Sequence, residues 1–223
     1  MKKFTAIILV LVMCLSMTAC GGGNKKAFEA SKAAYDNIDI AYEIVEKFGS
    51  DIYEAWRLGI YDDDEVIEDG AKYLAKELYL SADEIRAGVA YSIASLVGED
   101  WDEMSDENKN KLIDGADAFF EIMEDDLFSF CVNSVSNAYV VNGKVDEAQD
   151  ALNAAKAQMK ELSAEYSDYE HYPNLKGYFT TTSSFFDFCQ NPTGSFEQVK
   201  ETINKYKNEA RDYISDLDYI FEE

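Results

Sequence analysis

Apolar residues recur along most of the chain at the three- and four-residue spacing of an amphipathic α-helix. From residue 28 to residue 61 they occupy two heptad positions, which predicts one long helix with a seam for neighbouring helices. Gly49 falls on this seam, where it would let a neighbouring helix approach closely or let the helix bend. The seam residues are Phe28, Tyr35, Tyr42 and Trp56 at one position and Ile38, Val45 and Ile52 at the other.

Helix-start signals divide the next part of the chain. The carboxylates of residues 62–65 predict a second helix, because they accept hydrogen bonds from first-turn amides and match the helix dipole. Ser81 and Glu84 have the capping-box spacing and predict a short apolar helix over residues 82–97. Ser105 predicts the cap of a further helix, which would run towards Tyr139 without interruption.

The last third of the chain repeats the helical pattern. An Asn-Gly turn at residues 142–143 precedes apolar residues at helical spacing up to residue 166, and Pro173 suits the first turn of another helix. Ser195 and Gln198 form a second capping box, after which the apolar residues again alternate by three and four. We therefore expect an all-α fold over residues 26–223, as an antiparallel up-and-down bundle of six or seven helices with coiled-coil-like heptad seams. A division into two domains near residues 98–105 is the alternative.

The first twenty residues have the pattern of an export signal. Lys2 and Lys3 precede an apolar run of about 12 residues, which is shorter than the roughly 20 residues that a membrane-spanning helix needs. The segment Met17–Cys20 (Met-Thr-Ala-Cys) resembles the lipobox of bacterial lipoproteins. The resemblance implies a signal peptide over residues 1–19, cleavage before Cys20, and transfer of a diacylglycerol to its thiol. It also implies a further acyl chain such as palmitate.

A lipid on Cys20 would hold the protein on the extracytoplasmic face of the cell membrane. Residues 20–25 would form a short glycine-rich tether that reaches at most about 20 Å, so the domain is expected to sit close to the lipid headgroups. Lys25 and Lys26 would face those headgroups or form a solvated helix start. The membrane is thus the first expected partner.

The charge balance excludes one class of partner. The chain has 44 acidic and 20 basic residues and a net charge of −24, which becomes −26 when the two lysines of the leader are removed. Such a charge opposes nucleic acid and anionic membrane surfaces, and we expect no nucleic-acid partner. The hydrophobic share of 47% is enough to form a core, which disfavours disorder.

The chemistry-bearing residues are few. His171 is the only histidine, and the acidic runs lack the EF-hand spacing, so we expect no metal site, no cofactor and no catalytic constellation. After cleavage and lipidation, Cys131 and Cys189 are the remaining cysteines. They could form a disulfide in an exported domain, or pack as free thiols beside their Phe-x-Phe neighbours.

Tyrosines gather at the junction of two predicted helices. An aromatic patch there could bind a glycan or a protein, or the rings could simply pack locally. The patch would consist of Tyr166, Tyr169, Tyr172 and Tyr178.

These observations favour a non-enzymatic binding or interaction module near the membrane, with a protein or cell-wall partner. A phage-type exclusion lipoprotein also fits the export signal but has no dedicated motif in the sequence. A transport-associated solute receptor usually alternates strands and helices in two lobes, and no strand series appears in the pattern. A cell-wall enzyme that uses paired carboxylates would need a cleft with two converging acids.

Overall fold

The computed structural model describes residues 23–221 of the chain. This part folds into ten α-helices and two short 3₁₀ helices and contains no β-strand, which confirms the all-α prediction. The helices are α1 (Gly23–Tyr61), α2 (Asp63–Asp69), α3 (Ala71–Glu77), α4 (Ala82–Leu96), η1 (Trp101–Glu103), α5 (Asp106–Asp114), α6 (Ala118–Ile122), η2 (Glu124–Asp126), α7 (Leu127–Val141), α8 (Lys144–Glu165), α9 (Tyr172–Gln190) and α10 (Phe196–Phe221).

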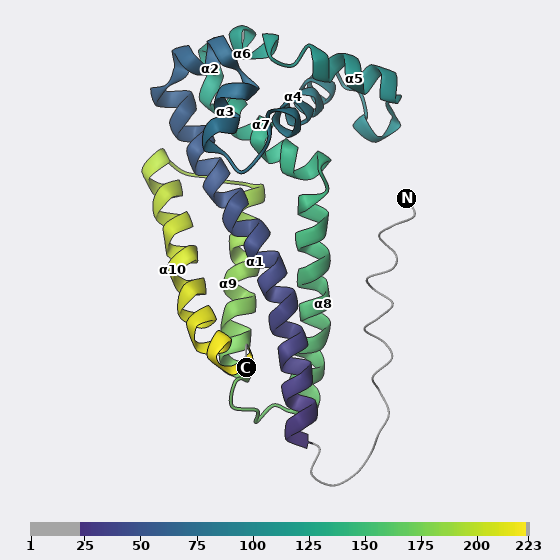
Figure 1. The fold of residues 1–223 in the computed structure, drawn as a ribbon, viewed down its shortest axis with the longest axis vertical. Helices are drawn as coiled ribbons and strands as arrows, with labels where there is room; N and C mark the ends of the chain where they lie inside the picture. The colour runs from purple at the N-terminus through teal and green to yellow at the C-terminus, as the bar shows by residue number, and fades with distance from the viewer. Residues whose placement is uncertain (1–22, 222–223) are drawn as a thin grey trace.

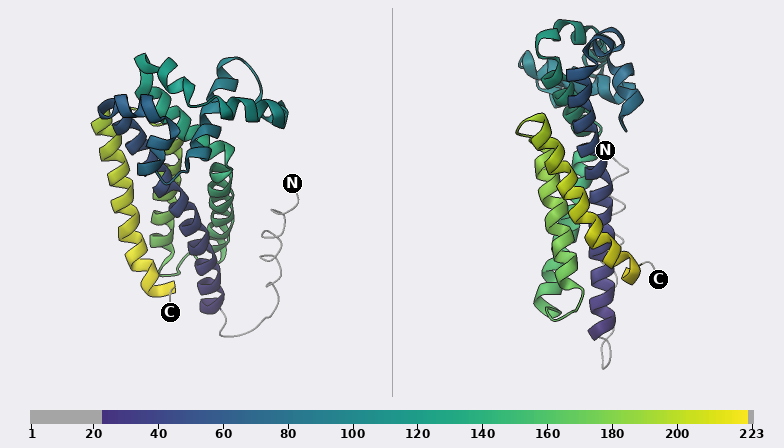
Figure 2. Two further views of the ribbon diagram at one scale, coloured as in Figure 1. Left: turned by 45° about the horizontal axis from the view of Figure 1, so that its top comes forward. Right: turned by 90° about the vertical axis from the view of Figure 1, so that its left-hand side faces the viewer.

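The four long helices α1, α8, α9 and α10 lie side by side and form what we call the stalk (Figure 1 and Figure 2). In Figure 1, α1 and α9 run upward and α8 and α10 run downward. The first helix, α1, packs against the other three, and α9 also packs against α8 and α10. The stalk is therefore organised around α1.

The helices from α2 to α7, residues 62–141, gather at the upper end of α1 and form what we call the head (Figure 1). Within it, α7 packs against both α4 and α1, so it joins the head to the stalk. The buried apolar side chains of both regions belong to one continuous cluster. The prediction of six or seven helices is too low because the head consists of several short helices rather than a few long ones.

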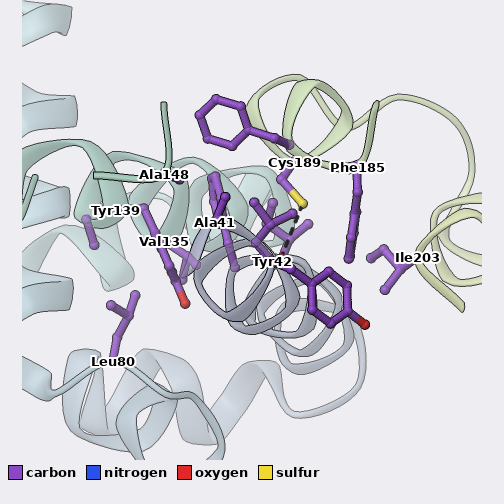
Figure 3. Close-up of a cluster of buried hydrophobic side chains, with 14 of the residues drawn as sticks. Ala41, Tyr42, Leu80, Val135, Tyr139, Ala148, Phe185, Cys189 and Ile203 are labelled. Carbon is purple, nitrogen blue, oxygen red and sulfur yellow. Dashed lines mark hydrogen bonds between the residues drawn. The ribbon is translucent and has the colours of Figure 1, made fainter. Parts of the chain in front are cut away.

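The apolar face of α1 is the centre of the core. Ile38, Val45 and Ile52 are completely buried, as the predicted spacing requires. At Gly49 a Cβ atom would lie 2.5 Å from the ring of Phe185 in α9, so the missing side chain allows the close approach expected there. Figure 3 shows side chains of α9 and of α7 on either side of α1.

The helix predicted from Ser105 to Tyr139 is wrong as a single element. It is divided into α5, α6, η2 and α7, with breaks at Gly115 and at Met123. Gly115 disfavours helix continuation, and the carboxylate of Asp117 bonds the distant amide of Ala71 (3.1 Å). At this break the Asp117 carboxylate therefore serves as the acceptor for the first amide of α3.

Most of the predicted helix ends are confirmed. Both capping boxes form, with Ser81 accepting a hydrogen bond from the Glu84 amide and Ser195 accepting one from the Gln198 amide. Ser105 caps α5 in the same way. The predicted cap at residues 62–65 is different: α2 begins there, but the Asp62 carboxylate pairs with a guanidinium of α1 instead of first-turn amides.

The leader and the lipidation residue Cys20 lie outside the described residues. The first helix already begins at Gly23, so the second half of the predicted tether, residues 20–25, is helical. Within residues 23–221, no helix is both long and apolar enough to cross a membrane.

Candidate functional site

A cavity of 410 Å³ opens beside the junction of the head and the stalk, and we call it the Trp56 pocket. Its walls come from α1, from one face of α7, and from the segment that leads from α9 to α10. The volume falls within the range of about 300–1,000 Å³ that is typical of small-molecule sites. The lining residues are Trp56, Phe128, Ser129, Val132, Asn133, Ser136, Asn137, Gln190, Asn191, Pro192 and Thr193.

The aromatic wall of this pocket is fixed by a close helix crossing. A Cβ atom at Gly59 would lie 2.6 Å from the Cα of Phe128, so α1 and α7 touch there through backbone. Trp56 precedes Gly59 by one helical turn on the same face and stacks against the Phe128 ring, with centroids 6.0 Å apart and planes 22° apart. The two rings are therefore held in one orientation by the packing of their helices.

The remaining wall is polar but uncharged. It carries side-chain amides and hydroxyls, and Asn133, Asn191 and Thr193 are exposed and able to contact a ligand. The Asn137 amide already donates to the Ser92 hydroxyl (2.8 Å), which orients one side chain of the wall. None of the lining residues is ionisable, although 29% of the chain is charged.

A second cavity of 270 Å³ lies between α1 and α10, and we call it the Lys207 pocket. The Lys207 ammonium donates to the Ser50 hydroxyl (2.6 Å), and burial lowers the pKa of this lysine. The Lys200 ammonium lies over the ring of Tyr53 (5.9 Å), a cation–π contact. The lining residues are Ser50, Tyr53, Glu54, Lys200, Ile203, Asn204 and Lys207.

A buried carboxylate connects the stalk to the head. Asp51 of α1 is 1% exposed and accepts hydrogen bonds from the Tyr79 amide (2.8 Å) and the Tyr139 hydroxyl (2.9 Å). Burial raises the pKa of Asp51 to about 6. Lys144, which is paired with Glu84 (2.9 Å), opposes this rise through its charge. No pocket described above reaches Asp51, so its contacts hold helices together rather than face a ligand.

The predicted tyrosine patch does not form as one surface. Tyr178 is completely buried in the stalk and donates to the Asp39 carboxylate (3.1 Å), so it is a core residue. Tyr166 and Tyr172 are partly buried against the same core. Tyr169 packs edge-on against the ring of His171 (5.2 Å). The helical spacing of Tyr178 with Leu175 pointed to the core, and it outweighs proximity in the sequence.

The two cysteines lie on different helices of the core. Cys131 is in α7 and Cys189 is in α9, and both are buried free thiols in the structure. Burial raises the pKa of the Cys131 thiol to about 12 and that of Cys189 well above its usual value, so neither thiol ionises readily. The Cys189 thiol points to the Val45 carbonyl of α1 (3.9 Å, Figure 3).

No metal-type cluster is present among residues 23–221, where no three His, Cys, Asp or Glu side chains are arranged to hold an ion. His171 is paired with Glu170 (3.3 Å) and lies at the α8–α9 junction, away from both pockets. Of the two pockets, neither brings two carboxylates together. Their chemistry is that of binding through hydrogen bonds, ring contacts and, in the Lys207 pocket, the ammonium groups of Lys200 and Lys207.

The sequence reasoning missed the Trp56 pocket, although one signal was available. Ser129, Asn133, Ser136 and Asn137 recur at helical spacing along α7, which is otherwise an apolar helix. A stripe of uncharged polar residues on such a helix marks a face that is neither core nor charged surface.

Comparisons with protein families, with curated proteins and with solved structures find no match for the chain.

Proposed function

We propose that the protein is a lipid-anchored, non-enzymatic binding protein on the extracytoplasmic face of the cell membrane. The observation that carries the proposal is the course of α1, an unbroken helix of 39 residues that begins close to Cys20 and ends in the head. At 1.5 Å per residue, such a helix is about 58 Å long. A lipid on Cys20 would therefore fix one end of the molecule and leave the head at the other end.

The stalk would serve as a spacer between the membrane and the binding site. The distance along α1 from Gly23 to Trp56 is about 50 Å, so an upright stalk would hold the Trp56 pocket well above the headgroups. We further propose that the stalk is an antiparallel up-and-down bundle with heptad seams, since interlocking side chains along α1 would keep such a spacer stiff. In this proposal only the start of the domain sits close to the membrane.

Binding is favoured over catalysis by the character of the pockets. The Trp56 pocket offers aromatic rings, amides and hydroxyls, which orient a ligand but do not transfer protons readily near neutral pH. In the Lys207 pocket the single acid, Glu54, is paired with Arg57 of the same helix (2.6 Å). We do not propose a two-lobed α/β solute receptor, because residues 23–221 contain no strand.

The anchoring half of the proposal is tested at Cys20. Cells that express the wild type or the Cys20→Ala variant are grown with a labelled fatty acid, and the protein is then separated into membrane and soluble fractions. We expect incorporation and membrane association of the wild type and loss of both in the variant, because the thiol is the acyl acceptor. Undiminished incorporation in the variant would overturn the anchoring claim.

The binding half is tested by crosslinking on intact cells. A photo-reactive amino acid is placed at Asn133, in the pocket, or at Lys160, an exposed residue of α8 in the stalk. We expect a captured species at residue 133 that is absent at residue 160. Equal capture at both positions, or none at either, would contradict a binding site beside the head.

A further inference from the structure

We infer that the Trp56 pocket binds a neutral oligosaccharide. The inference deepens the proposed function and rests on it, because it names the class of ligand for the same site. It is carried by three features of the pocket: its lack of charge, its supply of amide and hydroxyl groups, and its fixed aromatic wall.

The lack of charge selects an uncharged ligand. In a chain with a net charge of −24, an anionic ligand would meet repulsion and find no cation in the wall. A cationic ligand would find no carboxylate there. An ion that leaves water without a partner of opposite charge loses more hydration free energy than its new contacts return. A neutral ligand meets neither cost.

The polar groups of the wall match sugar hydroxyls. A side-chain amide both donates and accepts hydrogen bonds, as a serine or threonine hydroxyl also does, and each sugar hydroxyl does the same. The wall therefore satisfies a hydroxyl in either orientation, which a wall of carboxylates or ammonium groups does not. The amides come from Asn133, Asn137, Gln190 and Asn191, and the hydroxyls from Ser129, Ser136 and Thr193.

The aromatic wall supplies the apolar contact. A sugar ring presents C–H groups on its face, and these pack against an aromatic face with a small gain for each contact. Trp56 is half-buried and Phe128 is 38% exposed, so both rings are held by the core and still partly available. Because Gly59 fixes the crossing of α1 and α7, little ordering is needed on binding.

A neutral peptide is the competing ligand, and the groups that line the pocket match it less well than they match a sugar. A peptide backbone alternates donors and acceptors along a line and commonly pairs with backbone groups of a strand edge. The α1 and α7 walls present side chains, since their backbone groups are used within the helices. The groups on offer are scattered around a cavity rather than arranged in a row, which suits a polyhydroxylated ring.

The test uses Trp56 itself as the reporter. The chain has two tryptophans, and Trp101 lies in the head beside Tyr91 (5.8 Å), so Trp101→Phe leaves Trp56 as the single tryptophan. The full-length lipidated protein is held in a zwitterionic, sugar-free detergent, because alkyl glycosides would compete. The probes are a tetramer of N-acetylglucosamine, maltotetraose, a tetramer of galacturonate, and a capped tetra-alanine peptide.

We expect a saturable change of Trp56 fluorescence with at least one of the two neutral sugars and none with the galacturonate tetramer. The comparison of the two neutral sugars shows whether the ligand belongs to the N-acetylated or to the plain class of glycan. Replacing Asn133 by Ala should raise the dissociation constant about tenfold, because the net free energy of one hydrogen bond corresponds to roughly a tenfold change in affinity. The matched control is Asn110→Ala on the exposed surface of α5, which should leave the affinity unchanged.

Binding of the peptide without either sugar, or equal binding of the charged and neutral sugars, would overturn the inference. So would a sugar affinity that Asn133→Ala leaves unchanged, provided that circular dichroism shows the variant to be folded. Should both sugars fail while capture at residue 133 on cells succeeds, the ligand class is wrong and the proposed function still holds. Failure of capture, together with fatty-acid incorporation that Cys20→Ala leaves undiminished, would remove the proposed function itself.

Discussion

The stalk consists of helices of 19 to 39 residues, whereas no helix of the described head is longer than 15 residues. Helices shorter than about 12–15 residues are marginal alone and depend on contacts with their surroundings. Each stalk helix buries an apolar stripe over much of its length, while α5 of the head buries no residue fully. The stalk is thus stabilised mainly by continuous burial and the head partly by discrete polar contacts.

The Trp56 pocket lies where these two regions meet. Its aromatic wall depends on the α1–α7 crossing, and its far wall is the turn between two stalk helices. A site at such a junction combines a rigid support with a segment outside regular structure, residues 191–195, which can adjust to a ligand. Substitutions in the stalk, in the head and at their junction distinguish these two kinds of stabilisation.

The largest effect is expected in the stalk, at Leu217 of α10. Its side chain is completely buried, so Leu217→Ala should lower the free energy of unfolding by about 2–5 kcal/mol, through lost burial and an unfilled cavity. The measurement is urea unfolding followed by circular dichroism. The matched control is Tyr219→Ala on the same helix, which removes a side chain that is 82% exposed and should change stability by less than about 0.5 kcal/mol.

Equal losses for the two variants would show that burial along α10 does not determine the stability of the stalk.

The half-buried residues Tyr206 and Tyr213 mark a limit of the helical pattern in α10. Both occupy apolar positions of the helical spacing, yet they lie at the edge of the core, where the ring centroids of Tyr206 and Phe185 stack 5.3 Å apart. Tyr213 covers the site where a Cβ of Gly177 would lie.

A smaller effect, and one that depends on pH, is expected at the junction. Because the pKa of Asp51 is raised to about 6 from 3.8, the folded state binds its proton more tightly than the unfolded state between these values. The stability that Asp51 contributes is therefore lost as pH rises through this window, and its contribution is constant above it. Relative to Asp51→Asn, the wild type should lose about 2–3 kcal/mol of unfolding free energy between pH 4 and pH 7.

The measurement is the free energy of unfolding of both proteins across that pH range. Asp150→Asn, on the exposed face of α8, is the matched control and should keep the wild-type pH profile. Parallel profiles for the wild type and Asp51→Asn would show that Asp51 ionises as freely in the folded chain as in the unfolded one.

The stalk could be predicted from the sequence because the signals that determine its helices lie close to those helices in the chain. The apolar spacing over residues 28–61, the capping box at Ser195 and the Asn-Gly turn at residues 142–143 each lie within a few residues of the structure they determine. The head was less predictable because its breaks serve distant partners. Nothing near Asp117 in the sequence indicates that its carboxylate bonds the amide of Ala71.

The site shows the same division between local and distant information. The uncharged polar stripe on α7 can be recognised from residues 129–137 alone. Its partners cannot, because Trp56 has the spacing of a seam residue and residues 191–193 have the composition of a turn. Trp56 meets α7 at the close crossing beside Gly59, and residues 191–193 come to the pocket from the end of α9, so both depend on positions far apart in the chain.

The smallest effect of the three is expected within the head, at Asp117. Its carboxylate accepts from the Ala71 amide (3.1 Å) and pairs with the Arg86 guanidinium (2.9 Å), which ties α3 and α4 to the start of α6. Hydrogen bonds to charged groups contribute about 1.5–3 kcal/mol, but this side chain is 42% exposed and solvent weakens its ion pair. Asp117→Ala should therefore cost about 1–2 kcal/mol.

The location of that loss decides whether the head is held by discrete contacts. Hydrogen exchange should accelerate at the Ala71 amide and along α3 while the amides of α8 and α10 keep their wild-type rates, because the stalk does not use this carboxylate. Asp114→Ala, an exposed acid at the end of α5, is the matched control and should leave both regions unchanged. Acceleration spread evenly over stalk and head would mean that the two regions unfold as one unit, and that the polar contacts of the head stabilise the whole molecule rather than its upper end.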